Sequence, residues 1–120
     1  MTPSQEARVR ALLLALRPAT VHHGDCVGSD ARFHAICREA LGDAVRIVVH
    51  PPENPALRAF MPGDEVLPPR PYIARDDDII AASSTIIATP GEAAEVLRSG
   101  TWTTIRHARK AGKDVRIVTP

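Results

Sequence analysis

The chain has 120 residues, 44% of them hydrophobic, which is enough for one domain with a single core. Its 15 basic and 14 acidic residues give a formal net charge of +1, so no overall field favours a nucleic acid or a membrane surface. No apolar run approaches the length of a membrane span, and the start Met1–Glu6 lacks the pattern of a signal peptide. Two cysteines are a poor disulfide framework, so we expect a cytoplasmic protein with no membrane partner.

The first predicted element is a helix over residues 3–17. Thr2 and Gln5 form a capping-box pattern around Pro3, and Pro18 ends the helix. Four apolar residues recur between them at helical spacing: Val9, Leu12, Leu13 and Leu16.

Short strands and helices then alternate along the chain. Runs rich in β-branched residues predict strands over 20–23, 45–49, 85–89 and 115–118. Helices are predicted with an apolar face from Phe33 to Leu41, over 72–82 and over about 101–111. This alternation predicts a parallel sheet covered on both faces, in which ligands bind at the carboxyl ends of the strands.

The segment 51–71 interrupts the alternation. Its seven prolines exclude a helix and a central strand, so it is predicted to be a long loop. Loops of this length in a small domain are typically lids, binding loops or flexible segments.

Two turns carry the functional signal. Ser99, Gly100 and Thr101 open the last helix, where small residues leave backbone N–H groups free at the positive end of the helix dipole, an arrangement that suits a phosphate. The turn Gly24–Asp30 occupies the same position after an earlier strand. Because both turns fall on one edge of the predicted sheet, they predict a nucleotide or sugar-phosphate pocket.

Both turns also have purely structural interpretations. Ser99 is a favourable helix N-cap whether or not a ligand binds. In the earlier turn, Gly24 and Gly28 would supply positive φ angles, and Asp30 would favour the start of the next helix.

These turns resemble those of the SLOG superfamily of Rossmann-like domains, which includes the DNA-processing protein A family and the LONELY GUY phosphoribohydrolases. His23–Asp30 is similar to the first glycine turn, G-x-x-x-G-x-D, and Ser99–Thr104 is similar to the S-G-T-x-x-T phosphate turn of the DNA-processing branch. Arg75 precedes Pro90-Gly91 by fifteen residues, as an arginine precedes the P-G-G-x-G-T-x-x-E motif of the hydrolase branch. The resemblance covers residues 3–120.

The resemblance implies a single domain over 1–120 with a Rossmann-like three-layer α/β/α fold and a parallel sheet of about four strands. It also implies a nucleotide or a nucleotide-derived small molecule as ligand. We expect no cofactor and no metal ion, since His22 and His23 alternate along a strand and do not converge. The turns and the resemblance together indicate these ligand-binding residues: Gly24, Asp25, Gly28, Ser29, Asp30, Arg75, Pro90, Gly91, Ser99, Gly100, Thr101 and Thr104.

One departure from the family pattern concerns catalysis. Thr104 stands where the hydrolase branch has its catalytic glutamate, so the sequence favours binding over hydrolysis. The alternative is a phosphoribohydrolase in which Arg75 stabilises charge and Glu92 or Glu95, from the inserted loop, acts as acid or base. A single-stranded DNA-binding module is a third possibility, but it needs a basic stripe that this nearly neutral chain does not predict.

A second departure is at the start of the chain. Family members usually open with a central strand, whereas this chain opens on the capped helix; either the protein lacks that strand or the predicted start codon omits it. Without it, the flanking strands have unpaired edges, which a dimer partner or direct pairing of those strands would cover. We therefore expect a homo-oligomer, and a monomeric mass by light scattering would contradict this.

Arg75, the acidic run after it and Trp102 also have alternative interpretations. Arg75 would bind phosphate through its forked donors, or would be a solvated side chain paired with Asp76 or Asp78. The run Asp76–Asp78 would be a solvated face, or would have a metal-binding or general-base role. Trp102 would stack on a base or cover the core.

Overall fold

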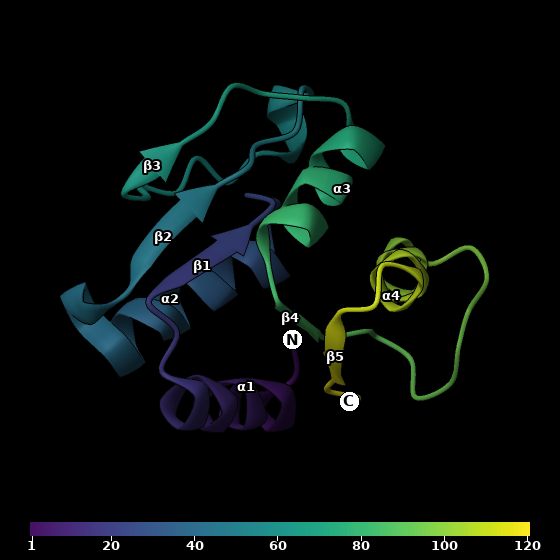
Figure 1. Ribbon diagram of the computed structural model, residues 1–120, viewed down its shortest axis with the longest axis horizontal. Helices are drawn as coiled ribbons and strands as arrows, with labels where there is room; N and C mark the ends of the chain where they lie inside the picture. Colours follow the sequence, from purple (N-terminus) through teal and green to yellow (C-terminus); the bar gives the residue numbers. More distant parts are fainter.

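The computed structural model describes all 120 residues and consists of helices that alternate with short parallel strands (Figure 1). The predicted α/β class is confirmed. No helix has both the length and the apolar character that a membrane crossing requires. In chain order the elements are α1 (Pro3–Leu16), β1 (Thr20–His23), α2 (Ser29–Leu41), η1 (Gly42–Ala44), β2 (Arg46–Val49), η2 (Pro55–Leu57), β3 (Glu65–Val66), α3 (Tyr72–Ala82), β4 (Thr85–Ala88), α4 (Gly100–Lys110) and β5 (Asp114–Ile117).

The five strands form two separate parallel sheets. The first sheet has the order β1-β2-β3, and the second contains only β4 and β5. Four of these strands are those that the sequence predicts; the additional β3 is two residues long and pairs with the end of β2. The expected four strands are therefore divided between two sheets. Direct pairing of β1 with β4, one of the two possibilities left open by the sequence, is not found.

The amino end of α1 is fixed by a buried glutamine. The predicted capping box is confirmed, because Thr2 Oγ1 accepts a hydrogen bond from Gln5 N and Gln5 Oε1 accepts one from Thr2 N. Gln5 Nε2 also donates to the carbonyl oxygens of Pro90, at 2.8 Å, and Val118, at 2.9 Å. These bonds hold the start of α1 at the carboxyl ends of β4 and β5.

Apolar packing joins the helices to the sheets. The largest core lies between α1, α2 and the first sheet, and it reaches the second sheet through Val118 and the partly buried Ile87. Its other fully packed members are Val9, Leu13, Val21, Ile36, Cys37, Val45, Ile47 and Val49. The helices α3 and α4 pack on β4 through two smaller clusters, Ile80 with Ile86 and Ala108, and Ala88 with Trp102 and Ile105. Trp102 is therefore a core residue.

The proline-rich segment is mostly irregular, as predicted, but it is fixed to the rest of the fold by Asp25. This carboxylate is completely buried; Oδ1 accepts a hydrogen bond from Met61 N at 3.0 Å, and Oδ2 lies 3.3 Å from Arg58 Nε. The backbone carbonyl of Asp25 also accepts from Ala59 N at 2.8 Å. Asp25 thus anchors the segment around residues 58–61.

Candidate functional site

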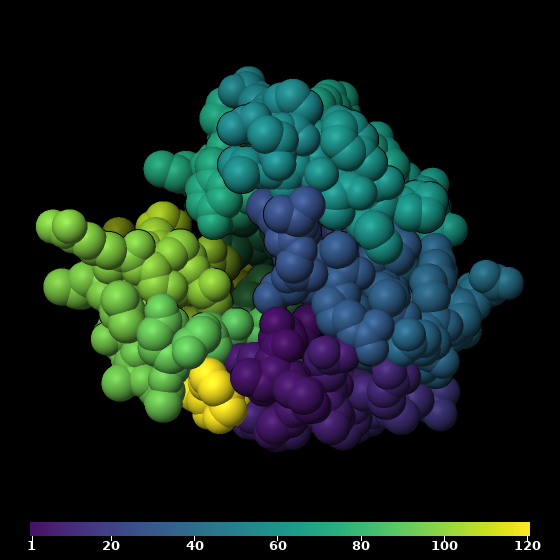
Figure 2. Space-filling model, turned by 180° about the vertical axis from the view of Figure 1, so that it is seen from behind, coloured from purple at the N-terminus to yellow at the C-terminus, as the bar shows by residue number.

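A cavity of about 640 Å³ lies between β1 and β4. It extends from the amino ends of these strands, at Pro18 and Ser83, to their carboxyl ends, at Ser29 and Thr101. Figure 2 shows a deep hollow at the centre of one face, where the N-terminal part of the chain (purple and blue) meets the green residues around 80–100. The carboxyl end of this cavity brings the two predicted turns and Arg75 together.

The first turn contributes Gly24, Ser29 and Asp30 to the cavity lining. Gly28 caps α2 with a φ of +94°, so its predicted positive φ is confirmed. The same prediction is wrong for Gly24, whose φ is not positive. Glycine is needed there for space instead, because a Cβ built on Gly24 would lie 1.5 Å from Arg75 Nη1.

Arg75 is the central residue of the site. The residue is 3% exposed, so the interpretation as a solvated arginine is wrong. Nη1 donates to the carbonyl oxygen of Gly24 at 2.7 Å, and the guanidinium lies 4.7 Å from the centre of the Tyr72 ring. Nε is buried without a hydrogen-bond partner, although it lies 3.4 Å from Asp76 Oδ1. The site therefore holds a buried cation with unused donor capacity.

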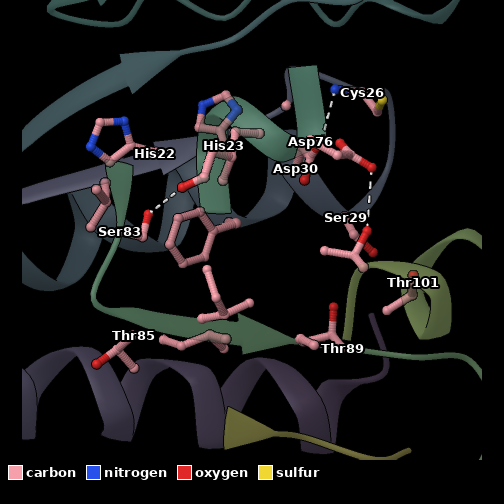
Figure 3. Close-up of a pocket in the computed structure, with 18 of the residues that line it drawn as sticks. His22, His23, Cys26, Ser29, Asp30, Asp76, Ser83, Thr85, Thr89 and Thr101 are labelled. Atoms are coloured by element: carbon pink, nitrogen blue, oxygen red, sulfur yellow. Dashed lines mark hydrogen bonds between the residues drawn. The ribbon is translucent and has the colours of Figure 1, made fainter. Parts of the chain in front are cut away.

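Two carboxylates flank Arg75 and line the cavity. Figure 3 labels both of them, Asp30 and Asp76. Asp30 Oδ2 lies 3.9 Å from Arg75 Nη1 and accepts a hydrogen bond from Cys26 N at 3.1 Å. Asp76 accepts a hydrogen bond from Thr104 Oγ1 at 3.3 Å. Burial raises the pKa of both carboxyl groups above their usual values, while the nearby Arg75 charge acts in the opposite direction.

Asp76 lines the cavity, so the prediction that it belongs to a solvated acidic face is wrong. The signal that would have identified it is helical spacing. Four α3 residues at i, i+3, i+4 and i+7 all line the cavity: Tyr72, Arg75, Asp76 and Ile79. Asp78, by contrast, is paired with Arg70 at 2.5 Å and belongs to the outer surface.

The start of α4 supplies backbone donors. Ser99 is the N-cap; its Oγ accepts from Trp102 N at 3.3 Å, and its carbonyl oxygen accepts from Thr103 N at 2.9 Å. The N–H groups of Gly100 and Thr101 have no acceptor within the chain. Thr101 and Thr104 line the cavity. Two free N–H groups therefore lie at the positive end of an eleven-residue helix.

Several predicted site residues lie outside the cavity lining: Asp25, Gly28, Pro90, Gly91, Glu92, Glu95, Ser99 and Gly100. Pro90 is buried and its carbonyl oxygen is bonded to Gln5. Glu95 pairs with Arg106 at 3.0 Å on the surface, and Glu92 has one buried carboxylate oxygen without a partner. Neither glutamate is brought to the carboxylates that flank Arg75.

The two histidines of β1 have different partners. His22 Nδ1 lies 2.9 Å from His50 Nε2, and His23 Nε2 lies 2.9 Å from His34 Nδ1. His23 Nδ1 accepts a hydrogen bond from Asp25 N, which places the His23 proton on Nε2. Burial lowers the pKa of His23 to about 4, so the side chain is neutral. No group of three or more His, Cys, Asp and Glu side chains is arranged to hold a metal ion.

Comparisons of this chain with protein-family models, with curated proteins and with solved structures find no match.

Proposed function

We propose that this chain is a Rossmann-like domain of the SLOG type, with α-helical layers on both sides of its strands, that binds a nucleotide or a nucleotide-derived phosphate. The ligand would bind at the carboxyl ends of β1 and β4. The observation that carries the proposal is the buried guanidinium of Arg75, whose Nε has no hydrogen-bond partner and whose side chain lines the cavity beside the start of α4. A buried cation without a full set of partners is costly in an empty site, and an anionic or hydroxyl-rich ligand would supply the missing acceptors.

The phosphate would bind at the amino end of α4. The free N–H groups of Gly100 and Thr101 are suitable donors, and the helix dipole favours an anion at this point. Gly100 also leaves room for Tyr72, since a Cβ at this position would lie 2.8 Å from the Tyr72 hydroxyl.

The ribose would bind between the phosphate and the first turn. Asp30 and Asp76 offer carboxylate oxygens as acceptors for hydroxyl groups, and Arg75 offers donors beside them. Val27 and Tyr72 line the same end of the cavity and are 61% and 47% exposed, so they present apolar surface for a base. The ligand would occupy only the carboxyl end of the cavity, whose whole volume is about 640 Å³.

A phosphoribohydrolase is the second candidate function, and one observation favours it. The Asp76 carboxyl lies in the cavity, held by Thr104, and burial raises its pKa, as is common for a general acid. In this version Asp76, in place of Glu92 or Glu95, would be the general acid or base, and Arg75 would stabilise the developing charge.

The test is native mass spectrometry of the purified protein with AMP, ADP-ribose and a cytokinin riboside 5′-monophosphate. We expect a retained intact nucleotide that is lost in Gly100→Asp, which adds a negative charge at the amino end of α4, where the phosphate would bind. Ala11→Asp is the matched control, because it adds the same charge at an exposed α1 position outside the cavity. Free base with ribose 5-phosphate would identify a hydrolase, and then Asp76→Asn should stop turnover. Absence of both binding and turnover would contradict the proposal.

A further inference from the structure

The cavity lining contains more acidic than basic side chains. Arg75 is the only Lys or Arg residue in the lining, whereas Asp30 and Asp76 both belong to it. A carboxylate oxygen of Asp30 lies 3.9 Å from Arg75 Nη1, and one of Asp76 lies 3.4 Å from Arg75 Nε. In Figure 3 the two carboxylates lie at the same end of the cavity as Ser29 and Thr101. One buried cation therefore serves two carboxylates before any ligand binds.

The amino end of α4 adds little positive charge to this balance. The amino end of a helix acts as about half a positive charge. Asp76 already lies against the first turn of α4, because its Oδ2 lies 3.3 Å from the Thr104 hydroxyl, which lies 3.1 Å from the carbonyl oxygen of Gly100. A phosphate at Gly100 would thus be about one helical turn, roughly 5.4 Å, from a carboxylate.

The other titratable groups of the lining supply no compensating charge. Burial lowers the pKa of His22 and lowers that of His23 to about 4, so both side chains are neutral at pH 7. Burial raises the pKa of the Cys26 thiol and that of the Tyr72 hydroxyl, so these groups also stay uncharged.

Charged groups just outside the lining do not change the balance either. Asp25 lies 3.3 Å from Arg58, and Asp77 lies 3.6 Å from His107. Arg98, which precedes the N-cap of α4, is exposed and does not line the cavity.

The number of free backbone donors points in the same direction. Ser99 N donates to the carbonyl oxygen of Val96 at 3.2 Å, and Trp102 N donates to Ser99 Oγ at 3.3 Å. Only the N–H groups of Gly100 and Thr101 are then free at the start of α4. Two donors match the two non-bridging oxygens of a phosphodiester, whereas a phosphate monoester presents three terminal oxygens.

We propose that this site selects a phosphate with a single negative charge, so that its ligand is a nucleotide whose phosphate is a diester rather than a terminal monoester. The inference rests on the proposed function and names the substrate class of the same site. A terminal phosphate carries close to two negative charges at pH 7, because its second pKa is about 6. A diester has no second proton to lose. The additional charge of a monoester would face Asp30 and Asp76, with Arg75 as the one cation for all three anionic groups.

The test is isothermal titration calorimetry with AMP and with its 5′-methyl phosphodiester, which has the same base and the same ribose hydroxyl groups. The Kd of each nucleotide is measured at pH 5.5 and at pH 7.5. We expect the ratio of the AMP Kd to the diester Kd to increase about tenfold or more between these values, because singly charged AMP becomes scarce above pH 6. A change in the protein itself affects both Kd values, so the ratio isolates the charge of the phosphate.

Two variants identify the carboxylates as the cause. Asp30→Asn and Asp76→Asn each remove one negative charge from the lining, and each should lower the ratio at pH 7.5 towards its value at pH 5.5. Asp78→Asn is the matched control. It makes the same change on α3 outside the cavity lining, and it should keep the wild-type ratio.

Three results would overturn the inference. A ratio that is equal at both pH values, or AMP bound more tightly than the diester at pH 7.5, would overturn it while leaving the proposed nucleotide site intact. A ratio that neither Asp30→Asn nor Asp76→Asn changes would show that the two carboxylates do not select the phosphate. Failure of both nucleotides to bind at either pH would overturn the proposed function, and this inference with it.

Discussion

The guanidinium of Arg75 occupies the space in which any side chain on residue 24 would lie. Nη1 donates to the carbonyl oxygen of Gly24 at 2.7 Å, and a Cβ at that position would lie 1.5 Å from Nη1 and 2.7 Å from Cζ. Gly24 therefore allows α3 to place a buried cation directly against the first turn. The two predicted elements of the site, the turn and the arginine, depend on each other.

Gly24→Ala should lower the free energy of unfolding by about 1–3 kcal/mol, because the added methyl group displaces Arg75 from a packed position. In an Arg75→Ala background the same substitution should cost clearly less, since the clash is gone. Urea unfolding of the wild type, both single variants and the double variant gives this coupling. An equal cost of Gly24→Ala in both backgrounds would show that the glycine is required for another reason.

Asp25→Asn should loosen the proline-rich segment. The buried carboxylate holds Met61 N and the Arg58 side chain, and removing one partner of a buried ion pair typically costs about 3–5 kcal/mol. We expect faster hydrogen exchange of the Met61 amide and a lower free energy of unfolding. Asp43→Asn, at an exposed position in η1, is the control and should change neither quantity.

The local elements could be predicted from the sequence because their signals are local. The capping box of Thr2 and Gln5, and the β-branched runs that become β1, β2, β4 and β5, depend on neighbouring residues alone. β3 could not be predicted, since two residues among prolines become a strand only by pairing with β2. The separation of β1 from β4 likewise depends on contacts between distant parts of the chain.

The site was predictable in position but less so in chemistry. Two turns after parallel strands must meet at one edge, so the location of Gly24–Asp30 and Ser99–Thr101 followed from topology. Whether a charged side chain is buried depends on what packs against it. Asp76 and Asp78 lie in one acidic run, yet only Asp76 lines the cavity; Asp78 pairs with Arg70 on the surface.

The buried histidines should make the fold sensitive to acid. Burial lowers the pKa of His23 to about 4, whereas an unfolded histidine has a pKa near 6.5, so the unfolded chain binds a proton first as the pH falls. Stability is therefore complete above about pH 6.5 and decreases towards pH 4. A shift of this size corresponds to roughly 3 kcal/mol for His23.

Urea unfolding between pH 4 and pH 8 measures this dependence. His34→Gln keeps a polar partner for His23 but removes one of the buried titrating groups, and its slope of stability against pH should be smaller than that of the wild type. The exposed His107→Gln is the control and should keep the wild-type slope. If both variants have the same slope, the buried pair does not determine the acid response.

Gln5 provides the last prediction, because one side chain connects α1 to the ends of both strands of the second sheet. Gln5→Glu keeps the acceptor for Thr2 N but replaces the donor to Pro90 and Val118 with a buried negative charge beside two carbonyl oxygens. Leaving buried polar groups unpaired costs about 1–3 kcal/mol, and the charge adds to this.

The cost of Gln5→Glu should depend on pH in a defined direction. Burial beside two carbonyl groups raises the pKa of the new carboxyl in the folded state, so its penalty relative to the wild type increases as the pH rises through the unfolded value of about 4.3. Gln5→Met is the control: it removes the same donor without adding charge, and its penalty should be the same at pH 5 and pH 7. If Gln5→Glu also shows the same penalty at both values, the side chain at position 5 has left the carbonyl oxygens for solvent, and the start of α1 is held by the Thr2 capping bond and by packing alone.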